Sequence, residues 1–311
     1  MYDPAFERLE ALAKEPDALA RTVAYVTVQL RSFLRRQERV LICFPNHGAS
    51  SFGGIMEKAV RQAEGIPLLW GSDYRWKALL RQAFVSRATT IVGPPLVILG
   101  LTKIARATET PLYIRNVLTA GYPCMNWMAD GIAKGLDCRI RSCYTLGNSP
   151  IVAGFSCAHS LGIHLRDDVY SVQIVDEDGS QLPEGTVGEV VLIPKSDPSV
   201  RYPVIETARL ESQDCGCGGG PRLMDFGPGR QMDPILFSIG ERIQSWTSVL
   251  DCRLEKGPCG LEMEVVVFPG EKLPQLPSCA KQVVRAWDPD RDMPLRLATG
   301  WKNVTNSANS H

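Results

Sequence analysis

Hydrophobic and polar positions follow two different periods along the first half of the chain. Residues 17–36 place apolar side chains at helical spacing, and Asp17 is a candidate N-cap for that helix. The apolar run at 38–44 then predicts a buried strand, and helix and strand patterns continue to alternate to about residue 146. Such regular alternation predicts an α/β fold with a largely parallel sheet covered by helices.

The pattern changes after residue 150. Residues 169–194 carry short β-rich runs separated by the turn sequences DEDG and PEG, which predict an attached β-rich subdomain. Residues 213–230 are rich in glycine and predict a hinge, and residues 233–302 predict a small α+β domain. We therefore expect three parts: an α/β core over 1–150, the β-rich subdomain over 151–228 and a small mobile C-terminal domain over 229–311.

Composition excludes some classes of function. The 311 residues carry 34 Lys+Arg and 34 Asp+Glu, so the chain has no basic excess for binding a nucleic-acid backbone. Apolar residues make up 44% of the chain, which is enough for a sizeable core. No uncharged apolar run is long enough to span a membrane, and the N-terminal stretch does not have the pattern of a signal peptide. We therefore expect a cytoplasmic protein that binds neither nucleic acid nor membranes.

The ten cysteines are many for a cytoplasmic chain of this length. Disulfides would explain them in an exported protein, but no export signal supports that explanation here. Four cysteines lie in or beside apolar segments and are predicted to be buried thiols. These four are Cys43, Cys124, Cys138 and Cys143.

A cluster of cysteine and histidine residues is the most specific chemical signal in the sequence. Two of the four histidines fall in one short window with a cysteine, and a glycine-rich Cys-x-Cys turn follows further along the chain. The candidate ligands are Cys157, His159, His164, Cys215 and Cys217. Zn²⁺ takes four tetrahedral ligands from thiolate sulfur and imidazole nitrogen, so we expect a structural zinc site that joins the β-rich region to the hinge. The alternative is two unrelated surface loops.

Two further segments have patterns that suit ligand binding. Segment 46–54 lies between a predicted strand and a predicted helix, where backbone N–H groups can hold an anion. It lacks the spacing of a phosphate loop, so a structural turn or a substrate-pocket wall is the alternative. Segment 201–206 combines Arg201 with Glu206, which could hold a ribose or a cation, or form a solvated strand end. The candidate pocket residues are His47, Ser51, Phe52 and Gly53.

Residues 17–230 resemble phenylacetate–CoA ligase and its relatives, a branch of the AMP-forming acid–CoA ligases. The longest match is 152–194, which includes the Cys/His segment and the LPEGTVGE turn. CYTLGN (143–148) occupies the place of the family's Y-G-[LM]-[ST]-E motif, and RYPVIE (201–206) that of R-Y-R-T-G-D. Weaker matches are CGCGGGPRL (215–223) to the C-P-C-G segment, GPGR ending at Arg230 to the arginine segment near the hinge, and PLRLATGWK (294–302) to the segment with the adenylation lysine.

The resemblance implies a two-step reaction on a small carboxylic acid. The carboxylate attacks the α-phosphate of Mg-ATP and gives acyl-AMP and pyrophosphate, and the coenzyme A thiol then displaces AMP. ATP, Mg²⁺ and coenzyme A are therefore the implied cofactors. In this scheme Tyr144 stacks near the adenine, Glu206 holds the ribose hydroxyls, and Arg230 lies near the ribose and the hinge. Lys302 neutralises the charge that develops at the carboxylate and α-phosphate.

Three departures from the family pattern bear on catalysis. The chain contains no S-S-G-T-T-G-x-P phosphate loop, and Pro203 and Ile205 replace family residues in the ribose segment. Asn148 stands where the family has a glutamate that helps to hold Mg²⁺, and neutral asparagine is a poorer partner for that ion. Two hypotheses follow. One is a ligase with impaired catalysis, acting as a homodimer or with a complementing N-terminal chain; the other is a non-catalytic, metal-stabilised relative that binds a partner or ligand.

Overall fold

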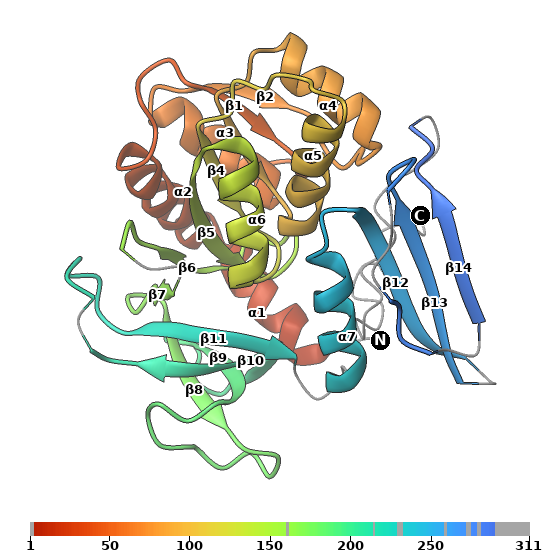
Figure 1. Cartoon of the computed structure of the whole chain (residues 1–311). Helices are drawn as coiled ribbons and strands as arrows, with labels where there is room; N and C mark the ends of the chain where they lie inside the picture. Colours follow the sequence, from red (N-terminus) through yellow and green to blue (C-terminus); the bar gives the residue numbers. More distant parts are fainter. Residues whose placement is uncertain are drawn as a thin grey trace.

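The computed structural model describes residues 3–159, 162–213, 215–228, 233–257, 260–271, 275–278 and 281–289. Figure 1 shows an α/β body, an antiparallel sheet extension beside it, and a C-terminal unit with its own small sheet. Among the described residues, no helix has the length and apolar character needed to cross a membrane. The predicted fold class is confirmed.

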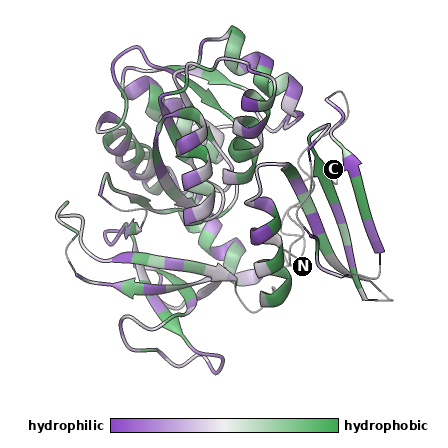
Figure 2. Cartoon of the chain, viewed as in Figure 1, coloured by the Kyte–Doolittle hydropathy of each residue, from purple (hydrophilic) through white to green (hydrophobic). Residues whose placement is uncertain are grey.

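Five parallel strands form the centre of the α/β body, in the order β2-β1-β3-β4-β5. They are β1 (Arg39–Ile42), β2 (Ile66–Leu69), β3 (Thr90–Gly93), β4 (Asn116–Thr119) and β5 (Arg139–Thr145). The helices of the body are α1 (Pro4–Lys14), α2 (Pro16–Arg31), α3 (Phe52–Gln62), α4 (Trp76–Val85), α5 (Pro95–Ala107) and α6 (Asn126–Leu136). In Figure 2 these helices carry both hydrophilic and hydrophobic residues, as expected for helices with one buried face.

The N-cap predicted for the helix over residues 17–36 is wrong. Helix α2 begins at Pro16, its N-cap is Glu15, and Asp17 lies inside the first turn. Proline favours the first helical position because its fixed φ suits the helix and its missing N–H would be unsatisfied there in any case. The preference of Pro16 for that position therefore outweighs the capping preference of Asp17.

The sheet continues beyond β5 as an antiparallel extension in the order β5-β6-β7-β11-β10-β9-β8. Its strands are β6 (Val152–Ser156), β7 (Ile163–Leu165), β8 (Tyr170–Val175), β9 (Gly188–Pro194), β10 (Tyr202–Glu211) and β11 (Arg222–Pro228). The predicted core and β-rich subdomain thus share one eleven-stranded sheet. The hinge predicted over 213–230 is wrong for residues 222–228, because they form β11 and pair with both β7 and β10.

The C-terminal unit packs against the α/β body. It comprises α7 (Pro234–Gln244), β12 (Val249–Gly257), β13 (Gly260–Val267) and β14 (Lys281–Ala286). Phe237 and Leu250 of this unit belong to the same buried hydrophobic cluster as residues of α5 and α6. Lys103 of α5 donates hydrogen bonds to the backbone carbonyls of Gln244, Trp246 and Val249.

The buried-thiol prediction is confirmed for three of its four cysteines. Cys43, Cys124 and Cys143 are buried, and burial raises the pKa of Cys124 to about 12. Cys138 is only partly buried. A thiol with a raised pKa has little thiolate at neutral pH, so these side chains act as small apolar residues of the core.

Candidate metal centre

Four of the five predicted metal ligands lie together at one end of the antiparallel extension. Cys157 directly follows β6, His164 lies in β7, and Cys215 and Cys217 lie in the loop between β10 and β11. One ligand atom from each side chain lies within 4.8 Å of the other three. Residues from two distant segments of the sequence therefore converge on one point, which the alternative of two unrelated loops does not account for.

The distances between these atoms suit a tetrahedral ion. The sulfurs of Cys215 and Cys217 lie 3.2 Å from His164 Nε2, and the Cys157 and Cys215 sulfurs are 3.6 Å apart. The Cys215 and Cys217 sulfurs are 3.0 Å apart. A tetrahedral Zn²⁺ with Zn–S bonds of about 2.3 Å separates its ligand atoms by roughly 3.5–3.8 Å. Small outward movements of the side chains would therefore give the ion its ordinary bond lengths.

The local backbone explains how the loop reaches this geometry. Gly216 and Gly218 have φ of 80° and 72°, a region that is strained for other residues. A Cβ on Gly219 would lie 2.8 Å from His164 Nδ1, so a side chain there would displace the imidazole. The glycines around Cys215 and Cys217 predicted a backbone that folds tightly around an ion, whereas the close approach of Gly219 to the His164 ring was not predicted.

The orientation of the His164 ring suits metal binding. Its Nδ1 lies 2.9 Å from the backbone oxygen of Gly220, and a hydrogen bond there places the ring proton on Nδ1. The lone pair of Nε2 then faces the cysteine sulfurs. Metal-binding histidines usually make such a second hydrogen bond, which fixes both tautomer and ring orientation.

The paired thiols of the loop share a proton. Hydrogen bonding from Cys217 lowers the pKa of Cys215 to about 6, while the same contact raises the pKa of Cys217 to about 11. One thiolate is therefore available near neutral pH, and a divalent ion would displace the remaining protons. Three thiolates and one imidazole are a donor set that suits structural Zn²⁺.

His159 is not among the four converging residues. Its side chain is exposed, and its backbone N–H donates to the Cys157 sulfur at 3.3 Å. A hydrogen bond of this kind stabilises a thiolate. The structure therefore gives His159 a supporting backbone contact in place of the predicted ligand position.

The turn at 46–54 is held together by its own hydrogen bonds. The amide of Phe52 donates to the Asn148 backbone oxygen, and the amide of Gly53 donates to Asn148 Oδ1 at 3.2 Å. Ser51 is the N-cap of α3, and its Oγ accepts from the Gly54 amide. The first amides of α3 thus have protein acceptors already, which favours the structural turn over an anion site.

The predicted pocket residues within this turn differ in exposure. His47 is exposed, whereas Phe52 is fully buried in the core. A Cβ on Gly53 would lie 2.4 Å from the Pro45 oxygen, so glycine is required by the close approach of the backbone. Asn148 Nδ2 donates to that same Pro45 oxygen at 3.2 Å. Asn148 therefore makes contacts that need both a donor and an acceptor, which a glutamate could not supply.

Tyr144 and Glu206 meet inside the sheet extension. The Tyr144 hydroxyl donates to Glu206 Oε2 at 3.1 Å, and the two residues are 1% and 5% exposed. Burial raises the pKa of Glu206 to about 7, although the hydrogen bond from Tyr144 lowers it in part. The Tyr144 ring also packs against Phe226. In this conformation neither side chain offers a face to a nucleotide, so their nucleotide-binding roles remain predictions. Arg230 and Lys302 lie outside the described residues.

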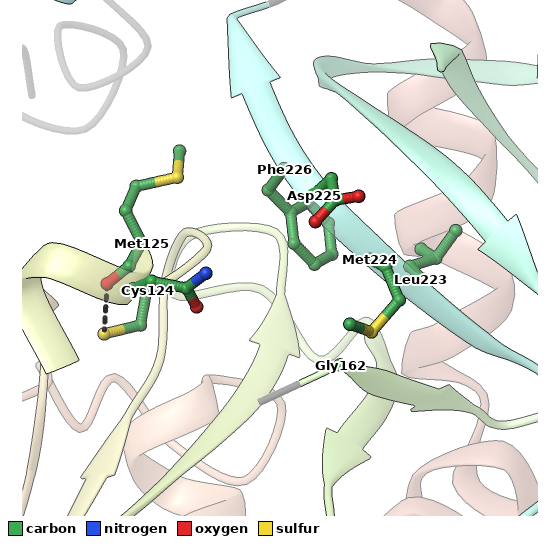
Figure 3. Close-up of a pocket in the computed structure, with 8 residues that line it drawn as sticks. Cys124, Met125, Gly162, Leu223, Met224, Asp225 and Phe226 are labelled. Carbon is green, nitrogen blue, oxygen red and sulfur yellow. Dashed lines mark hydrogen bonds between the residues drawn. The ribbon is translucent and has the colours of Figure 1, made fainter. Parts of the chain in front are cut away.

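A small pocket lies between the start of α6 and strand β11. Figure 3 shows Cys124 and Met125 on one side, with Met224 and Phe226 on the other. Its volume is about 220 Å³, below the ~300 Å³ at which ordinary ligand pockets begin. None of the predicted pocket residues of the 46–54 turn lines it.

Comparison with known proteins gives similarity at the level of the fold. No family model matches the chain, and neither does any curated protein sequence. A solved 2-hydroxyisobutyryl-CoA ligase in the postadenylation state, in complex with R3-HIB-AMP, superposes with a TM-score of 0.65 at 15% identity, over 79% of this chain and 58% of that one. The anthranilate CoA ligase AuaEII in complex with anthranoyl-AMP gives 0.57 at 9% identity, over 85% and 59%.

The amide bond synthetase McbA from Marinactinospora thermotolerans is also similar. It gives a TM-score of 0.53 at 16% identity, over 85% of this chain and 61% of that one. The chain therefore has the fold of these CoA ligases and of this amide bond synthetase. It spans less than two thirds of the length of each of them.

Proposed function

We propose that this chain is a metal-stabilised acid–CoA ligase of the phenylacetate–CoA ligase type, with slow adenylation. The observation that carries the proposal is the meeting of Tyr144 and Glu206 at 3.1 Å. These residues come from separate strands, and the resemblance assigns them to the adenine and the ribose. Their contact brings the two residues to one place within a fold that this chain shares with a CoA ligase solved in complex with R3-HIB-AMP, and a nucleotide would reach them once the pair separates. A small carboxylic acid is the proposed substrate.

The contacts of Glu206 account for slow adenylation. A carboxylate that accepts ribose hydroxyls must reach the ligand and carry a charge, whereas Glu206 is buried with a pKa raised to about 7. Binding of a nucleotide would first separate Glu206 from Tyr144, and a net protein hydrogen bond is worth about 0.5–1.5 kcal/mol. ATP, Mg²⁺ and coenzyme A would supply the phosphoryl and thiol chemistry when bound.

The metal centre has a structural role in this proposal. All four positions of a tetrahedral ion are filled by Cys157, His164, Cys215 and Cys217, so none is open to a substrate. The ion would join the β6–β7 connection to the β10–β11 loop. Elemental analysis of the purified protein would test it, and we expect about one equivalent of zinc.

A second candidate function is a non-catalytic binding subunit with the same metal centre. Asn148 favours it, because this side chain occupies the place of the family's Mg²⁺-binding glutamate and is committed to Pro45 and Gly53. A residue that closes a turn at both its oxygen and its nitrogen is not free to hold an ion. This candidate predicts a folded protein that binds no acyl-adenylate.

Two measurements separate the candidates. ATP–pyrophosphate exchange is measured with a panel of small aromatic and aliphatic acids, and calorimetry measures binding of acyl-sulfamoyl adenosines, which mimic acyl-AMP. We expect weak, acid-dependent exchange and clear binding of at least one analogue. Tyr144→Phe is the matched variant, and it should change analogue binding while leaving zinc content unchanged. A folded, zinc-loaded chain with neither exchange nor binding would eliminate the ligase proposal in favour of the second candidate.

A further inference from the structure

Arg222 lies beside a predicted metal ligand. It is the first residue of β11, and it is paired with His164 of β7 on one side and with Glu211 of β10 on the other. Directly opposed residues of an antiparallel pair project from the same face of the sheet, with Cβ atoms about 4.5–5.5 Å apart. The side chains of His164, Arg222 and Glu211 therefore form one row across β7, β11 and β10.

The guanidinium of Arg222 is poorly satisfied by its protein neighbours. Its Nε and Nη1 atoms are buried and have no hydrogen-bond partner among the described residues. The carboxylate in the same row, Glu211, interacts electrostatically with Arg222, but its hydrogen-bonded ion pair is with Arg209 at 2.7 Å. Buried cationic donors without a hydrogen-bond acceptor are unfavourable, so a second anionic group beside Arg222 would lower this cost further.

The loaded metal centre would be such a group. Three thiolates contribute three negative charges and a divalent ion two positive charges, so a centre with one neutral imidazole carries a net charge of about −1. We propose that Arg222 is the charge-balancing residue of the metal centre, and that its guanidinium stabilises the net negative charge of the three-thiolate, one-imidazole site. Arg222 acts on the centre through its positive charge and is not a metal ligand. The pairing of β11 with β7 places it beside His164.

A second arginine near the centre provides the comparison. Arg141 of β5 interacts electrostatically with Cys157, but burial lowers its pKa, and its Nη1 donates to Ser32 Oγ at 2.8 Å. Its guanidinium also lies over the Phe33 ring, 5.2 Å from the centroid. Because Arg141 has these other partners, the centre is expected to depend on it less than on Arg222.

The test measures zinc affinity by competition with a chromophoric chelator, in the full chain and without ATP or acid. Arg222→Met removes the charge and keeps much of the stem, and we expect zinc affinity to fall about tenfold or more, within the range for residues that support metal ligands. Arg222→Lys keeps the charge and should stay within about threefold of the parent. Arg141→Met, the matched control, should also stay within about threefold.

Cobalt substitution provides the second readout. The thiolate-to-cobalt absorption of the parent and of both Arg222 variants should report the same donor set, which separates a weakened centre from a rebuilt one. An affinity of Arg222→Met within twofold of the parent overturns the inference. The inference is also overturned if Arg222→Met and Arg222→Lys lose zinc affinity equally, or if Arg222→Met and Arg141→Met do. Should Arg222→Met not fold, Arg222→Gln and Arg222→Lys give the same comparison.

The inference rests on the metal centre of the proposed function but not on ligase activity. A parent chain that binds no zinc would overturn both the centre and the role of Arg222. A parent that binds zinc but neither exchanges pyrophosphate nor binds an acyl-adenylate analogue would leave the role of Arg222 intact and eliminate only the ligase proposal.

Discussion

The replacement Glu206→Gln should stabilise the protein at alkaline pH and have little effect at acidic pH. Burial of the Glu206 side chain raises its pKa from 4.5 to about 7, so the folded chain binds a proton that the unfolded chain releases between these two pH values. Stability of the parent therefore declines as pH rises from about 4.5 to 7 and then levels off. Glutamine imitates the protonated carboxyl and can still accept the hydrogen bond from Tyr144.

The expected magnitude follows from the size of the pKa difference. Proton linkage gives ~3 kcal/mol in favour of the variant at pH 8, and less than ~1 kcal/mol at pH 5. For a chain of this length, ~3 kcal/mol corresponds to a rise of roughly 5 °C in the melting temperature. Thermal denaturation followed by circular dichroism at pH 5 and pH 8 measures both values.

Glu211→Gln is the control on the same strand. The hydrogen bond from Arg209 lowers the pKa of the Glu211 carboxyl, so its stabilising contribution is present at high pH and is lost as pH falls. This variant should not gain stability at pH 8. If Glu206→Gln changed the melting temperature equally at pH 5 and pH 8, the carboxyl would be solvated and ionised in the folded protein, and our account of its burial would be wrong.

Three other perturbations give separate tests. Asn148→Asp should lower the free energy of unfolding by about 1–3 kcal/mol at pH 7, because a carboxylate oxygen would face the Pro45 carbonyl. Thermal melts at pH 7 and pH 4 should show this loss of stability becoming smaller as the carboxylate is protonated. Removing the metal with a chelator should increase hydrogen exchange at residues 156–165 and 211–223 and leave β1 and β3 protected. Unchanged exchange in these two segments after chelation would contradict the role of the centre. Lys103→Met should speed proteolytic release of the C-terminal unit, because three backbone carbonyls lose their donor. Burial lowers the pKa of Lys103 to about 8, so the parent should become more stable as pH rises from about 8 to 10.5, and the variant should lack this increase.

Local patterns predicted the fold class because each element of the body has its own period and length. The convergence of Cys157 with Cys215 and Cys217 was also predictable, since thiolate and imidazole groups suit one ion. The choice of His164 over His159 was not, because it depends on the pairing of β7 with both β6 and β11. Strand pairing is a long-range property that a short Cys/His window does not contain.

The burial of Glu206 could not be predicted for a related reason. Strand β10 shifts register against β9 between Pro203 and Thr207, and against β11 between Thr207 and Arg209. Strict alternation of side chains fails across such irregularities, so sequence position does not say which face a residue occupies. Pro203 fits this irregular stretch, because proline has no N–H to donate to a regular ladder.

The same strand order links the metal centre to the predicted nucleotide-facing residues. Tyr144 lies on β5 and Glu206 on β10, and these strands are joined only through β6, β7 and β11. The four converging ligands lie on β7, at the end of β6, and in the β10–β11 loop, so an ion there would fix the strands that set the distance between Tyr144 and Glu206. The strand pairing at this point is short, because β7 has three residues and shares only two register pairs with β11, and Tyr144 is also held by its buried cluster with Val204 and Ala208 of β10. An ion at this short strand would therefore strengthen the sheet extension where β7 and β11 share the fewest register pairs.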